Sequence, residues 1–186
     1  MKLLPELRWG LYNGWIFFLF YMIIFIITMS KCSKDVKKRL YDRSLWDKKT
    51  KIITAFGKSF SFINIIVICF SVLVIGNIEF FIGMICYSIG LLLLVMSIIN
   101  YRNAPLDQPI KNGFYKISRN PQMVSIYIMF AGMILVIGSW INLVFLGVSI
   151  ICSHFSILGE EHALTQQYGE SYLKYKKRVA RYFIFF

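Results

Sequence analysis

Long apolar segments alternate with short basic ones along the chain. Residues 9–30 and 123–158 contain no Lys, Arg, Asp or Glu, and each run exceeds the roughly 20 apolar residues that cross about 30 Å of hydrocarbon. Two further apolar segments cover residues 60–75 and 80–100. This pattern predicts an all-α polytopic membrane protein.

The longest uncharged segment, residues 123–158, has 36 residues, which is too many for a single span. Turn-forming residues at its centre, from Gly138 to Asn142, predict a short helical hairpin. The sequence therefore predicts about five transmembrane helices. Two belong to the hairpin, and the others are three earlier spans at residues 10–30, 60–75 (with an amphipathic lead-in at 52–59) and 80–100.

The distribution of charge orients these spans. Only 16% of the residues are charged, against about 25% in soluble domains, and the net charge is +12. Nine basic residues lie within residues 31–51, which the positive-inside rule assigns to the cytoplasm, together with residues 101–122 and the C-terminus. Because topology and anionic headgroups account for the basic excess, we do not expect nucleic-acid binding.

The chain divides at about residue 100. Residues 1–100 are expected to hold three spans and the basic loop, whereas residues 101–186 hold a polar loop, the hairpin and a cytoplasmic C-terminal amphipathic helix. The four cysteines form no Cys-x-x-Cys pair, and the two histidines have no third ligand of suitable type nearby. We therefore predict no metal site.

A polar segment before the hairpin, residues 112–121, combines several residues of chemical interest. Gly113 permits a backbone geometry that other residues resist, and Pro121 is suited to the first turn of a helix. Arg119 and Asn120 would then lie just outside the positive end of that helix, where an anionic group such as a carboxylate binds. Alternatively, Arg119 only anchors the span at the headgroups.

A second region of interest follows the hairpin. On a continuous helix of about 100° per residue, one apolar stripe with a carboxylate at its top is formed by Glu161, Leu164, Tyr168, Tyr172, Tyr175 and Val179. A carboxylate at that depth is costly unless it is paired, so Glu161 is expected to be a site residue, with Arg119 as its candidate partner. The alternative is an interfacial helix with a solvated acidic start.

These two regions resemble the signature of integral-membrane methyltransferases, a family that includes isoprenylcysteine carboxyl methyltransferase and phospholipid N-methyltransferases. The family pattern is Gly-x-Tyr-x-x-x-Arg-His/Asn-Pro-x-Tyr-x-Gly, followed by a Glu-Glu pair, Leu, Phe-Gly-x-x-Tyr-x-x-Tyr and finally Val-Pro-Arg. The matching residues here are Gly113, Tyr115, Arg119, Asn120, Pro121, Glu160, Glu161, Leu164, Tyr168, Gly169, Tyr172, Tyr175, Val179 and Arg181. The chain has Met123, Ser125 and Ala180 where the family has Tyr, Gly and Pro.

The resemblance implies an enzyme that uses S-adenosylmethionine (SAM) and whose active site faces the cytoplasm beneath a lipid-accessible acceptor cavity. It implies two catalytic residues, Arg119 and Asn120. The implied cofactor-binding residues are Gly113, Tyr115, Arg119, Pro121, Glu160, Glu161, Tyr168, Tyr172 and Tyr175. The acceptor would be a lipid or lipidated molecule, such as an isoprenylcysteine carboxylate or a phospholipid amine. Two alternatives stay open, a steroid-reductase-like enzyme that uses NADPH and a non-catalytic scaffold or transporter.

Overall fold

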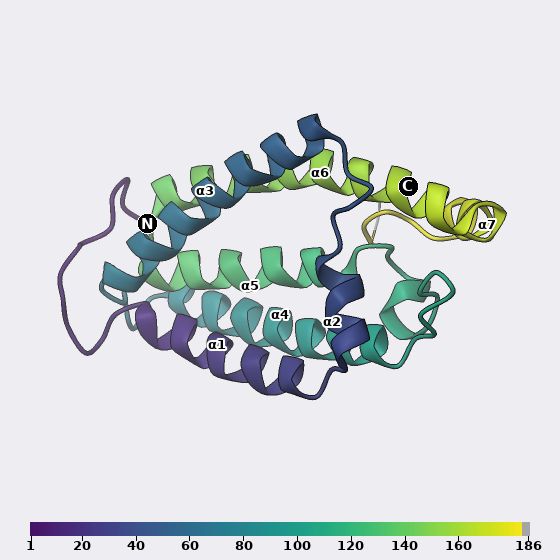
Figure 1. Cartoon of the computed structure of the whole chain (residues 1–186). Coiled ribbons are helices and arrows are strands. Elements are labelled where there is room, and N and C mark those ends of the chain that lie inside the picture. Colours follow the sequence, from purple (N-terminus) through teal and green to yellow (C-terminus); the bar gives the residue numbers. More distant parts are fainter. Residues whose placement is uncertain (184–186) are drawn as a thin grey trace.

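The computed structural model describes residues 1–183 as a helical bundle (Figure 1). Within those residues there are seven α-helices, one 3-10 helix and no strand, which confirms the predicted all-α class. The elements are α1 (Trp15–Ser30), α2 (Lys34–Tyr41), α3 (Lys48–Phe70), α4 (Ile78–Arg102), the 3-10 helix η1 (Gly113–Lys116), α5 (Pro121–Ile137), α6 (Trp140–Tyr168) and α7 (Glu170–Arg178).

Five of these helices are apolar. The helices α3, α4 and α6 have 23, 25 and 29 residues and are long and apolar enough to cross a membrane. The helices α1 and α5 are shorter, with 16 and 17 residues, or about 24–26 Å at the usual rise per residue. The structure thus confirms three candidate spans and contains the two further apolar helices that a five-span topology requires.

The N-terminal segment explains two boundaries that were predicted wrongly. Helix α1 begins at Trp15, five residues later than predicted, and α3 ends at Phe70, five residues earlier. The chain before α1 folds back against residues 71–74, where the backbone N–H of Val72 donates to the carbonyl of Glu6 at 3.0 Å. These bonds hold both segments in extended conformations, so neither can continue a helix.

Helix α3 also begins earlier than the predicted span. Its first residue is Lys48, and the side chain of Asp47 caps it by accepting a hydrogen bond from the backbone N–H of Thr50 at 2.7 Å. Such a cap satisfies an N–H group that has no partner within the helix. The predicted lead-in at residues 52–59 is therefore part of one continuous helix.

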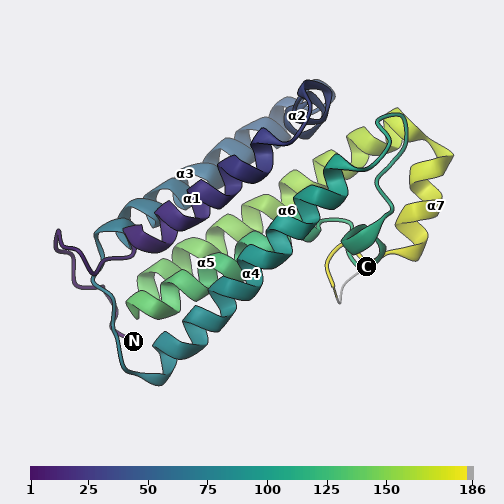
Figure 2. The same ribbon diagram turned by 90° about the horizontal axis from the view of Figure 1, so that it is seen from below.

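Two closely packed helix pairs form the bundle, α4 with α5 and α3 with α6 (Figures 1 and 2). A Cβ at Gly90 of α4 would lie only 2.4 Å from the backbone nitrogen of Met129 in α5, so the first pair depends on glycine at this contact. In the second pair the buried Asn142 Nδ2 donates to Oδ1 of Asn64 at 2.5 Å. Helix α1 packs against both α4 and α3.

The predicted hairpin between α5 and α6 is confirmed, including its turn. Gly138 ends α5 in the left-handed conformation, with a φ of +63°, which glycine adopts without steric cost. Ser139 caps α6 by accepting a hydrogen bond from the backbone N–H of Asn142.

The C-terminal region is not the single amphipathic helix that was predicted. Helix α6 ends at Tyr168, and Gly169, with a φ of +52°, turns the chain before α7 (Figure 2). Glycine is the residue best able to adopt this conformation, so it marks the break. The predicted stripe becomes one apolar cluster across the bend, formed by Leu164, Tyr168, Tyr172, Tyr175 and Val179.

Candidate active site

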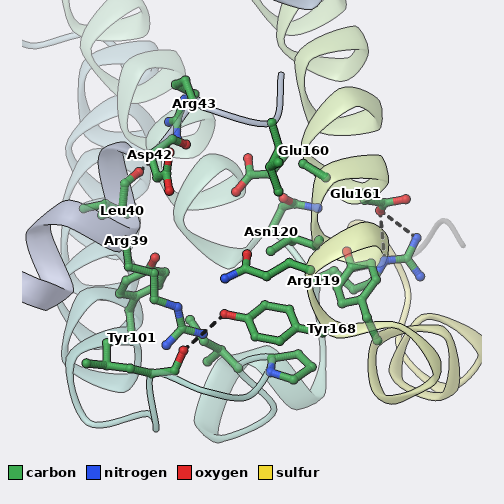
Figure 3. Close-up of a pocket in the computed structure, with 18 of the residues that line it drawn as sticks. Arg39, Leu40, Asp42, Arg43, Tyr101, Arg119, Asn120, Glu160, Glu161 and Tyr168 are labelled. Atoms are coloured by element: carbon green, nitrogen blue, oxygen red, sulfur yellow. Dashed lines mark hydrogen bonds and ion pairs between the residues drawn. The ribbon is translucent and has the colours of Figure 1, made fainter. Parts of the chain in front are cut away.

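A pocket of about 360 Å³ opens at the end of the bundle near α7 (Figure 3). Its walls are α2 with the loop that follows it, the polar segment between α4 and α5, and the last turns of α6 with α7. The volume falls within the range of about 300–1,000 Å³ that is typical of small-molecule sites. The predicted site residues that line it are Tyr115, Arg119, Asn120, Glu160, Glu161, Tyr168, Tyr172 and Tyr175.

Gly113 and Pro121 shape the pocket without lining it. Gly113 has a φ of +57°, and a Cβ there would lie 2.1 Å from Nδ2 of Asn100. Pro121 is the first residue of α5, a position where its missing N–H has no cost. The two residues hold the chain between them so that Arg119 and Asn120 lie at the start of α5, as predicted.

Tyr115 connects η1 to two neighbouring helices. Nε2 of Gln122 donates to its hydroxyl at 3.0 Å, and the Tyr175 hydroxyl donates to its backbone carbonyl at 2.7 Å. Burial raises the pKa of both tyrosines, so the phenols stay protonated and keep their donor capacity. This contact fixes α7 against the polar segment.

Arg119 and Glu161 form a buried ion pair, as expected from their positions at the ends of hairpin-linked helices. Nε of Arg119 donates to Oε1 of Glu161 at 3.0 Å, and Nη2 lies 2.9 Å from the same oxygen. Nη1 donates to the backbone carbonyls of Lys176 and Val179 at 2.8 and 2.6 Å. Only 3% of each side chain of the pair is exposed. All three guanidinium nitrogens of Arg119 are therefore engaged within the protein.

Two further cations surround Glu161. Nε and Nη2 of Arg181 donate to its two carboxylate oxygens at 3.0 and 3.1 Å, and Nζ of Lys176 lies 3.2 Å from Oε2. The hydrogen bond to Glu161 raises the pKa of Arg181, which keeps that guanidinium charged. Both oxygens of Glu161 are thus held by protein groups from the chain just before α5, from α7 and from the chain after α7.

Asn120 lies between this ion-pair network and the pocket. Its Nδ2 donates to the carbonyl of Arg181 at 3.3 Å, and its backbone N–H donates to Oγ of Ser118 at 3.1 Å. Its amide oxygen makes no hydrogen bond within residues 1–183. Because Asn120 lines the pocket, this oxygen can accept a hydrogen bond from a bound molecule.

Glu160 differs from its neighbour Glu161. Its half-buried side chain lines the pocket, and Figure 3 shows its carboxylate directed towards the wall that carries Asp42 and Arg43. No ion pair to Glu160 is present within the described part of the chain, where every ion pair at this end of the bundle involves Glu161. Three or more possible metal ligands do not gather anywhere in residues 1–183. An acidic group in this setting favours a cationic ligand.

Aromatic side chains form much of the remaining pocket surface. The Tyr168 hydroxyl donates to the carbonyl of Leu106 at 3.3 Å, and the ring centroids of Tyr172 and Tyr175 lie 5.9 Å apart. The faces of aromatic rings attract cations. Together with Glu160, they suit a ligand that carries positive charge and an aromatic base, as SAM does.

The sequence analysis missed one wall of the pocket, the segment from α2 to Trp46. Arg39 attaches this wall to the polar segment, because its Nη1 and Nη2 donate to the carbonyls of Pro105 and Gln108 at 2.7 and 2.8 Å. Its guanidinium also lies 5.3 Å from the ring centroid of Tyr101. Membrane topology and contact with anionic headgroups are the two explanations that the sequence offers for this basic loop. The sequence signal was Trp46, a large apolar residue among charged ones. In the structure its side chain is buried, so this loop also packs against the protein.

A second cavity, of about 280 Å³, lies among α1, α3, α5 and α6. Most of its lining is apolar, and Met123 borders both this cavity and the pocket. The Tyr127 side chain also lines it, and its buried hydroxyl has no hydrogen-bond partner among the described residues. The two spaces therefore share Met123, in the first turn of α5, as a wall residue.

Comparison with known proteins identifies the family. The model of the phospholipid methyltransferase family matches residues 52–171, about two-thirds of the chain. No match was found among curated proteins or among solved structures. Proteins of this family are SAM-dependent membrane methyltransferases. The chain therefore belongs to the phospholipid methyltransferase family and is a multi-pass integral membrane methyltransferase that uses SAM.

Proposed function

We propose that the enzyme transfers the methyl group of SAM to a lipidic acceptor that enters from the bilayer, of the isoprenylcysteine-carboxylate or phospholipid-amine class. The observation that carries the proposal is that two different spaces lie on either side of one residue, Met123, which lines both of them. One is charged and aromatic, and the other is mostly apolar and lies among the spans. The first suits SAM, and the second can accommodate a hydrocarbon chain.

On the SAM side, the predicted site residues divide into two roles. When bound, SAM supplies an activated methyl group on a sulfonium. We assign Glu160 to its ammonium group and the pocket tyrosines to its sulfonium and adenine. Arg119 and Glu161 are already paired, so we assign them to positioning the start of α5 and α7. Gly113 and Pro121 maintain the backbone that this arrangement requires.

On the acceptor side, the residues need mainly to orient the acceptor and to exclude water from it. Because the methyl donor is already activated, aligning the acceptor and excluding water supply much of the rate enhancement. Asn120 can accept a hydrogen bond from an acceptor amine through its amide oxygen, and this is the role we assign to it. Met123, where the family signature has Tyr, gives the wall shared by the two spaces an apolar side chain.

The proposed orientation places the pocket at the cytoplasmic face. The loop of residues 31–51, which holds nine basic residues, contributes one wall of the pocket. Basic loops remain preferentially on the cytoplasmic side of a membrane. The charge distribution thus supports a cytoplasmic source of SAM.

The proposal is tested by incubating purified, detergent-solubilised protein with methyl-labelled SAM and fractionated membrane lipids. Labelled lipid should appear, and its identification names the acceptor class. Glu160→Gln should reduce labelling at low SAM concentration, and NADPH should not bind. Absence of SAM binding and of label transfer by folded protein would refute the proposal, whereas SAM binding without lipid labelling would refute only the lipidic acceptor.

A further inference from the structure

The methionine part of SAM carries both an ammonium and a carboxylate, so its pocket requires two opposite charges that are not already paired. Arg119 uses its guanidinium on Glu161 and on two backbone carbonyls. Glu161 in turn is held by three cations. Glu160 can take the ammonium. The carboxylate therefore needs a cation from elsewhere on the pocket wall.

Arg43, in the loop after α2, has the required free donors. Its Nη1 donates to the carbonyls of Leu40 and Asp42 at 3.1 and 2.7 Å, and its guanidinium lies 4.4 Å from the ring centroid of Trp46. These contacts fix the guanidinium plane. Nε and Nη2 donate no hydrogen bond within residues 1–183. Arginine presents such paired donors in a geometry that matches a carboxylate.

The other cations that line the pocket are less suited to this role. Arg39 uses both Nη1 and Nη2 on backbone carbonyls, and Arg119 is buried in its ion pair. Lys38 is exposed, and no ion pair within the described residues holds its ammonium group. Among the pocket cations in residues 1–183, Arg43 is therefore the one that is both held in place and free to bind.

Arg43 and Glu160 face one another across the pocket, one from the loop after α2 and the other from α6 (Figure 3). We propose that they clamp the amino-acid part of SAM, with Arg43 binding the carboxylate and Glu160 binding the ammonium. Arg43 lies outside residues 52–171, which match the family. The N-terminal loop of this chain thereby completes the site. This inference rests on the proposed function.

The test compares SAM with decarboxylated SAM, which keeps the sulfonium, the adenine and the amine. Affinities are measured by calorimetry on purified protein without acceptor, for the wild type, Arg43→Gln, Arg43→Lys and the control Lys34→Gln. Lys34 is exposed on the same helix-loop segment and does not line the pocket. Arg43→Gln should lower the affinity for SAM roughly tenfold to a hundredfold and leave the affinity for decarboxylated SAM unchanged. The wild type should prefer SAM by a similar factor, Arg43→Lys should keep part of that preference, and Lys34→Gln should keep all of it.

The outcomes separate this inference from the proposed function. Failure of the folded wild type to bind SAM would overturn both. If the wild type binds SAM but Arg43→Gln lowers the affinities for the two ligands equally or not at all, the proposed role of Arg43 is wrong and the methyltransferase assignment stands. Should Arg43→Gln fail to fold, the comparison of the two ligands on the wild type tests the inference. Equal affinities of the wild type for SAM and decarboxylated SAM would exclude any cation that binds the carboxylate.

Discussion

Nε of Arg119 lies 3.0 Å from Oε1 of Glu161, which joins the start of α5 to α6 at the wall of the pocket. Arg181 and Lys176 reach the same carboxylate from the chain after α7 and from α7 itself. One buried carboxylate thus holds together three segments that form the site. Its neighbour Glu160 belongs to none of these contacts. The two adjacent glutamates should therefore respond differently to the same substitution.

Glu161→Gln should lower stability. The substitution leaves Arg119 buried without its counter-charge, and breaking a buried ion pair from one side typically costs about 3–5 kcal/mol. The melting temperature in detergent, followed by loss of helical signal or by aggregation, measures this loss. Glu170→Gln is the control, since Glu170 is exposed at the start of α7. Equal melting temperatures for Glu161→Gln and wild type would show that the network does not stabilise the fold.

Gly113→Ala should disrupt the polar segment. The φ of +57° is unfavourable for alanine, and the added Cβ would lie 2.1 Å from Nδ2 of Asn100. Strain of this kind costs of the order of 1–3 kcal/mol, and SAM affinity should fall with it because Arg119 and Asn120 move. Gly147→Ala is a matched control in α6, where a Cβ meets nothing within 4 Å and helix propensity improves. A Gly113→Ala protein as stable as Gly147→Ala would contradict the backbone strain expected from the positive φ of residue 113.

Local signals in the sequence were sufficient for several parts of this structure. Pro121 at a helix start and Gly138 at a turn follow from backbone restrictions that belong to those residue types. The pairing of Arg119 with Glu161 was also predictable, because a carboxylate near the membrane needs a partner. Each of these inferences depends on the residue itself and on few neighbours.

Other features depended on contacts that the sequence does not display. The end of α3 at Phe70 follows from pairing with the N-terminal segment, although the apolar run itself continues. The bend at Gly169 was missed because the apolar spacing continues through it. Arg43 was overlooked because a basic loop has a sufficient explanation in membrane topology. Its position in the pocket wall depends on how the chain after α2 packs in the folded protein.

The topology prediction concerns four positions. Single cysteines at Lys38, Lys111 and Lys177, in a cysteine-free background, should be shielded from impermeant reagents in intact cells and react after permeabilisation. A cysteine at Asn77 should react in intact cells, because α3 and α4 place it at the opposite end of the bundle (Figure 1). Membrane permeabilisation provides the control for each site. Labelling of the Lys111 and Lys177 positions from opposite sides would contradict the fold, because Lys111 Nζ donates to Ser171 at the start of α7.

Glu160→Gln should weaken SAM binding and leave stability unchanged, the reverse of the result expected for Glu161→Gln. The amide keeps the shape of the side chain but cannot neutralise the ammonium of SAM. A charge-assisted hydrogen bond is worth about 1.5–3 kcal/mol, so the SAM dissociation constant should rise roughly tenfold to a hundredfold. Calorimetric titration of the two single variants measures this, with Glu170→Gln as the matched loss of one negative charge outside the pocket. If Glu160→Gln binds SAM as tightly as wild type while Glu161→Gln, measured on its folded fraction, does not, then the buried network contacts the cofactor and Glu160 does not.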